Sequence, residues 1–270
     1  MTPGWPAAPA GHFQLKGQGL PTSALLLTLA LAVAALWLLA RLLRAGQARV
    51  AARAGYFAEV AGLFTDVTTR LEPSGFARMA GVWDGARFDL QAVPDTLTFR
   101  KLPVLWVLIT LTEPMPVPGE VHVMARPGQD DTFSRFNKMP VSIALPPDFP
   151  EYCALRCSAA TVLPAADLLA ARGALFTAGI VKELVIAPQA LRLVILADEA
   201  ERGAYLLFRE AELGQVPLMP DHLIPHLRAL LHLRADLDNA SETDRAQKSA
   251  CAQESARAQD SARARESTRA

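Results

Sequence analysis

The chain has 270 residues, a formal net charge of zero and 51% hydrophobic residues, with only three cysteines. A balanced charge creates no global field that would attract nucleic acid, so we expect no nucleic-acid partner. An odd and low number of cysteines argues against a disulfide-rich scaffold.

The N-terminal region contains a predicted membrane anchor. The run Ala24–Ala40 has no charged residue, and Leu20–Leu43 is long enough to cross a bilayer core of about 30 Å if the charged end of Arg41 reaches the interface. Leucine and alanine cover every face of this helix, which is not typical of a core helix. We therefore predict a transmembrane helix over residues 21–44, preceded by a short extracytoplasmic segment over residues 1–20.

Basic residues directly after the apolar run predict its orientation. Lys16 is the only lysine or arginine before the run, and no acid occurs until Glu59. The positive-inside rule then places the arginine side in the cytosol. A cleaved signal peptide, the alternative, has its basic residues before the apolar region. The predicted membrane-interface residues are Trp37, Arg41, Arg44, Arg49 and Arg53.

Together these patterns predict a single-pass signal anchor in a plasma (inner) membrane, with the C-terminal domain in the cytoplasm. The composition, rich in alanine, arginine and leucine, is typical of a bacterial protein.

The next segment, residues 47–72, has a helical pattern of apolar residues at spacings of three and four after a first step of seven. We predict a juxtamembrane helix whose apolar stripe packs on the protein's own sheet. Self-association of this stripe as a short coiled coil is the alternative. The stripe residues are Val50, Phe57, Val60, Phe64, Val67 and Leu71.

A region rich in β-strand signals follows. Phe76–Trp83 and Ala86–Val93 flank the dipeptide Asp84-Gly85, which favours a two-residue hairpin turn because both residues tolerate positive φ. Pro103–Thr112 is apolar enough to be a central buried strand. Further predicted strands are Thr96–Arg100, Val121–Ala125 and the segment that contains Cys153 and Cys157.

Two features of this region invite a functional interpretation. Residues 126–140 lack periodicity and contain Asp130 and Asp131, so they are either a recognition or cation-binding loop or, as we favour, a solvated loop. Cys153 and Cys157 lie four residues apart, about 13 Å along a strand, which is too far for a disulfide. We expect both thiols to be reduced.

In the second half of the chain, helices and strands occur in groups. We predict a helix over Pro164–Ala178 and a final helix over Asp221–Asp238. This grouping indicates an α+β fold with a largely antiparallel sheet, formed by a domain over residues 76–238. The predicted strands of this half are Val181–Ala187, Leu191–Ala197 and Ala204–Glu210.

The C-terminal residues 239–270 contain a six-residue repeat with charges of both signs and no large apolar side chain after residue 248. Such a segment cannot bury enough surface to offset its ordering entropy. We predict a low-complexity disordered tail, or at most a frayed solvated helix.

No nucleotide-binding, metalloprotease or nucleophile-elbow motif occurs in the chain, so we predict no catalytic residue and no cofactor. The best residual metal candidates are His222 and His226, which share a helix face at the i, i+4 spacing. Pro225 lies between them and would remove His222 from that face if the helix began there. The acids Asp198, Glu199 and Glu201 are interpreted as a solvated turn.

We therefore expect a non-catalytic protein: a cytosolic α+β binding or assembly module held at the membrane surface. Its expected partners are the lipid bilayer and either another protein or a second copy bound through the juxtamembrane helix. The alternatives are a membrane-tethered enzyme, or an envelope-exposed domain if the topology is inverted.

Overall fold

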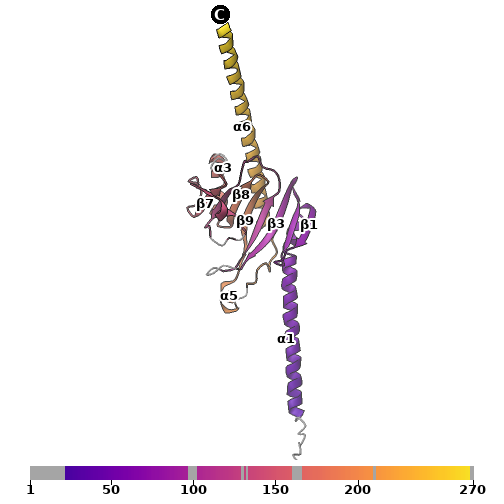
Figure 1. Ribbon diagram of the computed structural model, residues 1–270. Helices are drawn as coiled ribbons and strands as arrows, with labels where there is room; N and C mark the ends of the chain where they lie inside the picture. Colours follow the sequence, from indigo (N-terminus) through magenta and orange to yellow (C-terminus); the bar gives the residue numbers. More distant parts are fainter. Residues whose placement is uncertain are drawn as a thin grey trace, which may run out of the picture. The chain divides into compact units, whose positions relative to one another are not determined.

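The computed structural model describes residues 22–96, 102–128, 131, 133–159, 166–208 and 211–267, and these form an α+β fold (Figure 1). The chain divides into two compact units, Met1–Ala48 and Arg49–Ala270. The elements that precede the central strand are α1 (Thr22–Ala54), α2 (Ala58–Ala61), β1 (Thr65–Leu71), β2 (Ala77–Trp83) and β3 (Ala86–Asp95). The later elements are β4 (Val104–Leu111), β5 (Val121–Ala125), η1 (Phe136–Lys138), β6 (Val141–Ile143), β7 (Cys153–Cys157), α3 (Ala166–Ala170), α4 (Ala174–Thr177), β8 (Val181–Ala187), β9 (Ala190–Glu199), α5 (Arg202–Phe208) and α6 (Pro220–Ser267).

Helix α1 begins at the predicted position and continues past the arginines to Ala54. None of its residues is buried, and its leucines are exposed on all sides. Within the described residues, a single helix near the N-terminus is long and apolar enough to cross a membrane. The guanidinium of Arg41 lies 5.4 Å from the centroid of the Trp37 ring, one turn earlier.

The prediction of one juxtamembrane helix over residues 47–72 was wrong. The chain turns at Gly55, forms the single turn α2, and is extended from Thr65. The β-branched residues at positions 65, 67, 68 and 69 favour a strand, and this preference outweighs the helical spacing of the stripe. The predicted docking of the stripe is confirmed for Phe57, Val60 and Phe64, which are buried in the core. The other stripe residues, Val50, Val67 and Leu71, are exposed.

One sheet contains all the strands of the described residues, and every neighbouring pair is antiparallel. Its order is β1-β2-β3-β4-β9-β8-β5-β7-β6. The predicted hairpin is confirmed, with Asp84 at φ 49° and Gly85 at φ 74° in the turn. Strand β4 is central and buried as predicted, since β3 and β9 flank it.

The strand registers separate the sheet into two faces. On the core face, a continuous row of side chains crosses seven strands, and each is at most 1% exposed: Met79, Leu90, Ile109, Leu193, Leu184, Val123 and Leu155. Helix α6 packs against β4 and β9 on this face through leucines at positions 223, 227, 230, 233 and 237. The opposite face, which we call the open face, contains the polar side chains described below.

Two elements of the second half differ from their predictions. The helix expected over Pro164–Ala178 is two short helices, α3 and α4, separated by a turn at Gly173, where a Cβ would lie 2.4 Å from the carbonyl oxygen of Asp148. The strand expected over Ala204–Glu210 is helix α5. Its first turn is capped by the carboxylate of Glu201, which accepts hydrogen bonds from the N–H groups of Gly203 and Ala204 at 2.9 and 2.5 Å.

The final helix is longer than predicted. It begins at Pro220, so Pro225 lies early in the helix and does not mark its start. The helix continues to Ser267, through part of the segment for which a disordered tail or at most a frayed solvated helix was predicted. Side chains 242–249 are exposed, and the last buried leucine of the helix is Leu237. The strand predicted over Thr96–Arg100 falls largely on residues 97–101, outside the described residues.

Candidate functional site

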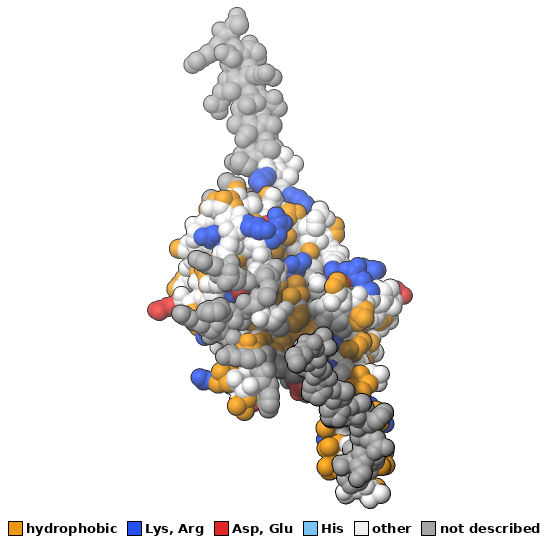
Figure 2. All heavy atoms as spheres, turned by 60° about the horizontal axis from the view of Figure 1, so that its bottom comes forward, with side chains coloured by type: hydrophobic (Ala, Val, Ile, Leu, Met, Phe, Trp, Pro, Cys, Tyr) orange, Lys and Arg blue, Asp and Glu red, His pale blue; other side chains and the backbone are white. Residues whose placement is uncertain are grey.

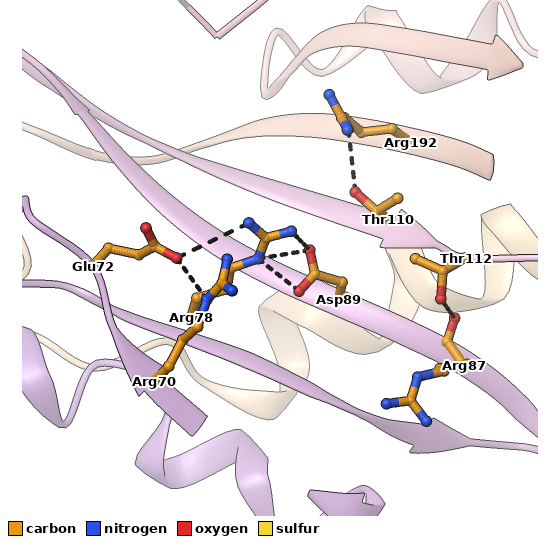
Figure 3. A network of polar contacts seen from close by, with 8 residues as sticks. All are labelled: Arg70, Glu72, Arg78, Arg87, Asp89, Thr110, Thr112 and Arg192. Carbon is orange, nitrogen blue, oxygen red and sulfur yellow. Dashed lines mark hydrogen bonds and ion pairs between the residues drawn. The ribbon is translucent and has the colours of Figure 1, made fainter. Parts of the chain in front are cut away.

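A polar surface covers the open face of β1, β2, β3, β4 and β9. We call it the arginine face. It is built by the registers, which place Asp89 opposite Ala80 and Thr110, and Thr110 opposite Arg192 (Figure 3). A shallow pocket at its β1 end is lined by Thr68, Thr69, Arg70, Arg78, Ala80 and Asp89.

The charges on the arginine face are only partly compensated. Arg78 donates two hydrogen bonds to Asp89, from Nε at 2.8 Å and from Nη2 at 2.6 Å, and this bonding raises the pKa of Arg78. Arg70 donates to Glu72 at 2.9 Å. Arg192 donates its Nε to the hydroxyl of Thr110 at 3.1 Å.

No ion pair joins Arg87 or Arg192 to a carboxylate in the described part of the chain. The polar network drawn in Figure 3 contains four arginines, at positions 70, 78, 87 and 192, and two carboxylates, Glu72 and Asp89. A further carboxylate, Glu113, accepts a hydrogen bond from the backbone N–H of Arg87 at 3.4 Å and pairs with Arg234.

A second polar cluster lies on the same side of the sheet, beneath the loop over residues 126–140. His122 on β5 and Glu183 on β8 are 3% and 1% exposed. His122 Nδ1 lies 2.9 Å from Glu183 Oε1, and the hydroxyl of Ser134 in the loop donates to the same oxygen. Glu183 thus bonds the loop and strand β5 to strand β8.

The other side of the His122 ring faces Glu120. The distance from His122 Nε2 to Glu120 Oε2 is 3.4 Å, and Arg135 of the loop lies 3.4 Å from Glu120 Oε1. Ser134, His122 and a carboxylate are the residue types of a nucleophilic triad, but their order here differs. Ser134 bonds the carboxylate and not the imidazole, so the Ser-His-carboxylate order of a triad is not formed. The arrangement is that of a structural clamp, which we call the Glu183 clamp.

The loop has further contacts that hold it to the sheet. Lys182 donates to the carbonyl oxygens of Ala125 and Arg126 and lies 3.3 Å from the carboxylate of Asp131. The ring of Phe133 lies 5.5 Å from that of Trp106. The described residues of this loop are therefore fixed and not freely solvated, and Asp131 already has a cationic partner. Asp130 lies outside the described residues.

The histidine pair on α6 remains isolated. His222 is exposed and His226 is half-buried, and burial together with the neighbouring His222 lowers the pKa of His226. No group of three metal-ligating side chains occurs among the residues that the structure describes. The pair has the predicted helical spacing, but nothing described adds a third ligand.

The cysteines of β7 are free, as expected from their spacing. Burial raises the pKa of both thiols, so neither is activated as a nucleophile.

Two of the predicted membrane-interface arginines contact the domain. Arg49 lies 3.5 Å from Glu212, and the guanidinium of Arg53 lies 5.6 Å from the centroid of the Phe76 ring.

Sequence reasoning missed both the arginine face and the Glu183 clamp. A signal for the clamp was present, because His122 and Glu183 each interrupt an apolar strand, and a titratable side chain in a buried strand must find a partner. Their pairing across 61 positions could not be read from the sequence.

Comparisons with protein-family models, with curated proteins and with solved structures gave no match.

Proposed function

We propose that this chain is a single-pass plasma-membrane protein of bacterial type whose cytosolic domain is a non-enzymatic binding module at the membrane surface. The observation that carries this proposal is helix α1. Its leucines are exposed on every side, and an exposed apolar surface of this extent is stable in lipid and unfavourable in water.

The proposed orientation follows from charge. Arg41, Arg44, Arg49 and Arg53 all follow the apolar run, and residues of this kind are retained on the cytosolic side of a bacterial membrane. The half-buried and buried reduced thiols of β7 are compatible with a reducing compartment.

The arginine face supports the binding role. It contains the guanidinium groups of Arg87 and Arg192, which no carboxylate pairs within the described residues, and such groups suit hydrogen bonding to carboxylates. We assign it to an acidic segment of a protein partner. The Glu183 clamp, in contrast, bonds a loop to the sheet.

A fluorescent peptide rich in Glu and Asp is the probe for this surface. Full-length protein in detergent should bind it with a strong salt dependence, and the double variant Arg87→Glu/Arg192→Glu should bind about tenfold more weakly. Fluorescence anisotropy at low and high salt measures both effects.

Arg228→Glu, an exposed position on α6, is the matched control and should bind as the wild type does. Equal affinity of the wild type and the double variant would remove the arginine face from the binding role.

A further inference from the structure

The segment between β9 and α6 exposes an unusual amount of apolar surface. We call residues 199–219 the basal segment, of which residues 199–208 and 211–219 are described. Leu207 is 78% exposed and Val216 is 70% exposed, and these are the two highest values among the large apolar side chains described, higher than any in α1. Leu206 and Met219 add 56% and 43%.

Hydrogen bonds fix this segment to the end of the domain that follows α1. The N–H of Leu218 donates to the carbonyl of Tyr56 at 2.9 Å, and the N–H of Gly214 donates to the carboxylate of Asp198 at 2.9 Å. Glu212 lies 3.5 Å from Arg49. The part of the basal segment over residues 212–218 is therefore held beside the first residues of the domain. Before α5, the N–H of Ala200 donates to the carbonyl of Pro103 at 2.9 Å.

The same contacts keep this segment close to the anchor. Arg49 follows Arg44 by five residues, a reach of about 18 Å at most whatever path the chain takes. The length of the connecting chain therefore limits the distance between the end of the predicted membrane helix and the basal segment, whatever the angle between the anchor and the domain.

Two acids of the segment have partners within the domain, since Glu201 caps α5 and Glu212 pairs with Arg49. Glu199 is exposed at the start of the segment. In Figure 2, which turns the lower end of Figure 1 toward the viewer, hydrophobic side chains lie at the surface with basic and acidic side chains among them. Exposed apolar side chains close to a membrane anchor gain stability if they are buried in the interface of the same membrane.

We infer that the basal segment inserts the leucines of α5 into the headgroup region of the same membrane, as a second contact beside the anchor. The inference rests on the proposed membrane anchoring. The contact would restrict the tilt of the domain and hold the arginine face at a fixed height above the lipid.

Spin-label accessibility in liposomes tests this inference on the full chain. In a background with Cys153, Cys157 and Cys251 replaced by Ala, a nitroxide is attached at Leu207→Cys, at Leu36→Cys in α1, or at Gln189→Cys. Gln189 is exposed in the turn before β9, at the end of that strand opposite to α5. Collision with oxygen reports lipid, and collision with a water-soluble nickel complex reports solvent.

At position 207 we expect a ratio of oxygen to nickel collisions several-fold above that at position 189 and below that at position 36, as for a site at the depth of the headgroups. A lipid signal at 36 with a solvent signal at 207 would overturn the inference and leave the anchor standing. Shielding of 207 from both reagents would also overturn it, because a protein would then cover the leucines. A solvent signal at 36 would reject the anchor itself.

If the cysteine-free chain fails to fold, Leu207→Trp and Gln189→Trp in the natural cysteine background replace the labels. Brominated lipids should then quench the added fluorescence at 207 and leave that at 189 unchanged. Quenching that is equal at the two positions would contradict the inference.

Discussion

Replacing His122 with Ala is expected to lower the free energy of unfolding by about 3 kcal/mol. The carboxylate of Glu183 is 1% exposed and receives its bonds from His122 and Ser134. Removing the imidazole leaves a buried carboxylate with one donor and an empty space beside it, and a buried group of this kind is costly when a partner is lost. The loop containing Ser134 should also loosen, since Glu183 is its bridge to the sheet.

Urea unfolding of the full chain in detergent, followed by tryptophan fluorescence, measures this loss. Trp106 contacts Phe133 of the loop and reports its release. His232→Ala, an exposed histidine on α6, is the matched control and should change stability by less than about 0.5 kcal/mol.

The double variant His122→Leu/Glu183→Leu should be more stable than His122→Ala, because no charged group is then left unpaired in the interior. If His122→Ala lowered the free energy of unfolding as little as His232→Ala does, the Glu183 clamp would have no structural role.

Gly214→Ala is expected to destabilise the protein by about 2 to 4 kcal/mol, because alanine is strained at positive φ and its Cβ would overlap the ring of Phe76. Gly214 has φ +72°, and a Cβ at this position would lie 2.4 Å from Cε1 of Phe76. Phe76 is fully buried and also packs edge-on against Tyr56 at 5.7 Å, so its ring has no space into which it could move.

Gly179→Ala provides a matched control that measures the cost of placing alanine at positive φ alone. Gly179 has φ +71°, and nothing lies within 4 Å of a Cβ built there. Its cost should be about 1 kcal/mol, and the difference between the two variants measures the overlap with Phe76. Thermal melting of the two variants side by side gives this difference. Equal melting temperatures would show that the basal segment is not packed against Phe76 as described.

The features that could be predicted from the sequence are those with a local cause. The Asp84-Gly85 hairpin follows from the positive φ that both residues tolerate, and the run from Val104 to Leu111 is too apolar for an exposed strand. The start of α6 near Asp221 follows from the periodic leucines. In each case a few consecutive residues determine the element.

The errors occurred where local and tertiary preferences compete. Val67 and Leu71 continue a helical spacing, yet their neighbours are β-branched and pair with β2, so the chain is extended there. Leu206 and Leu207 resemble a strand, but capping by Glu201 makes α5 a helix. A pattern of apolar residues alone does not decide between these states.

The candidate site could not be predicted for a different reason. The arginine face brings together residues from five strands, from Arg70 to Arg192, and their proximity depends on the strand order. That order places β9 beside β4, although 78 residues separate the end of β4 from the start of β9, which no local pattern specifies. The charges were visible in the sequence, but their common face was not.

Membrane topology tests the central claim most directly. Two reporters are fused after Ala270 of the full chain: a fluorescent protein that matures only in the cytosol, and a phosphatase that is active only outside it. The arginines after α1 predict fluorescence without phosphatase activity. Phosphatase activity without fluorescence would contradict the account, because the domain and its arginine face would then lie in the cell envelope.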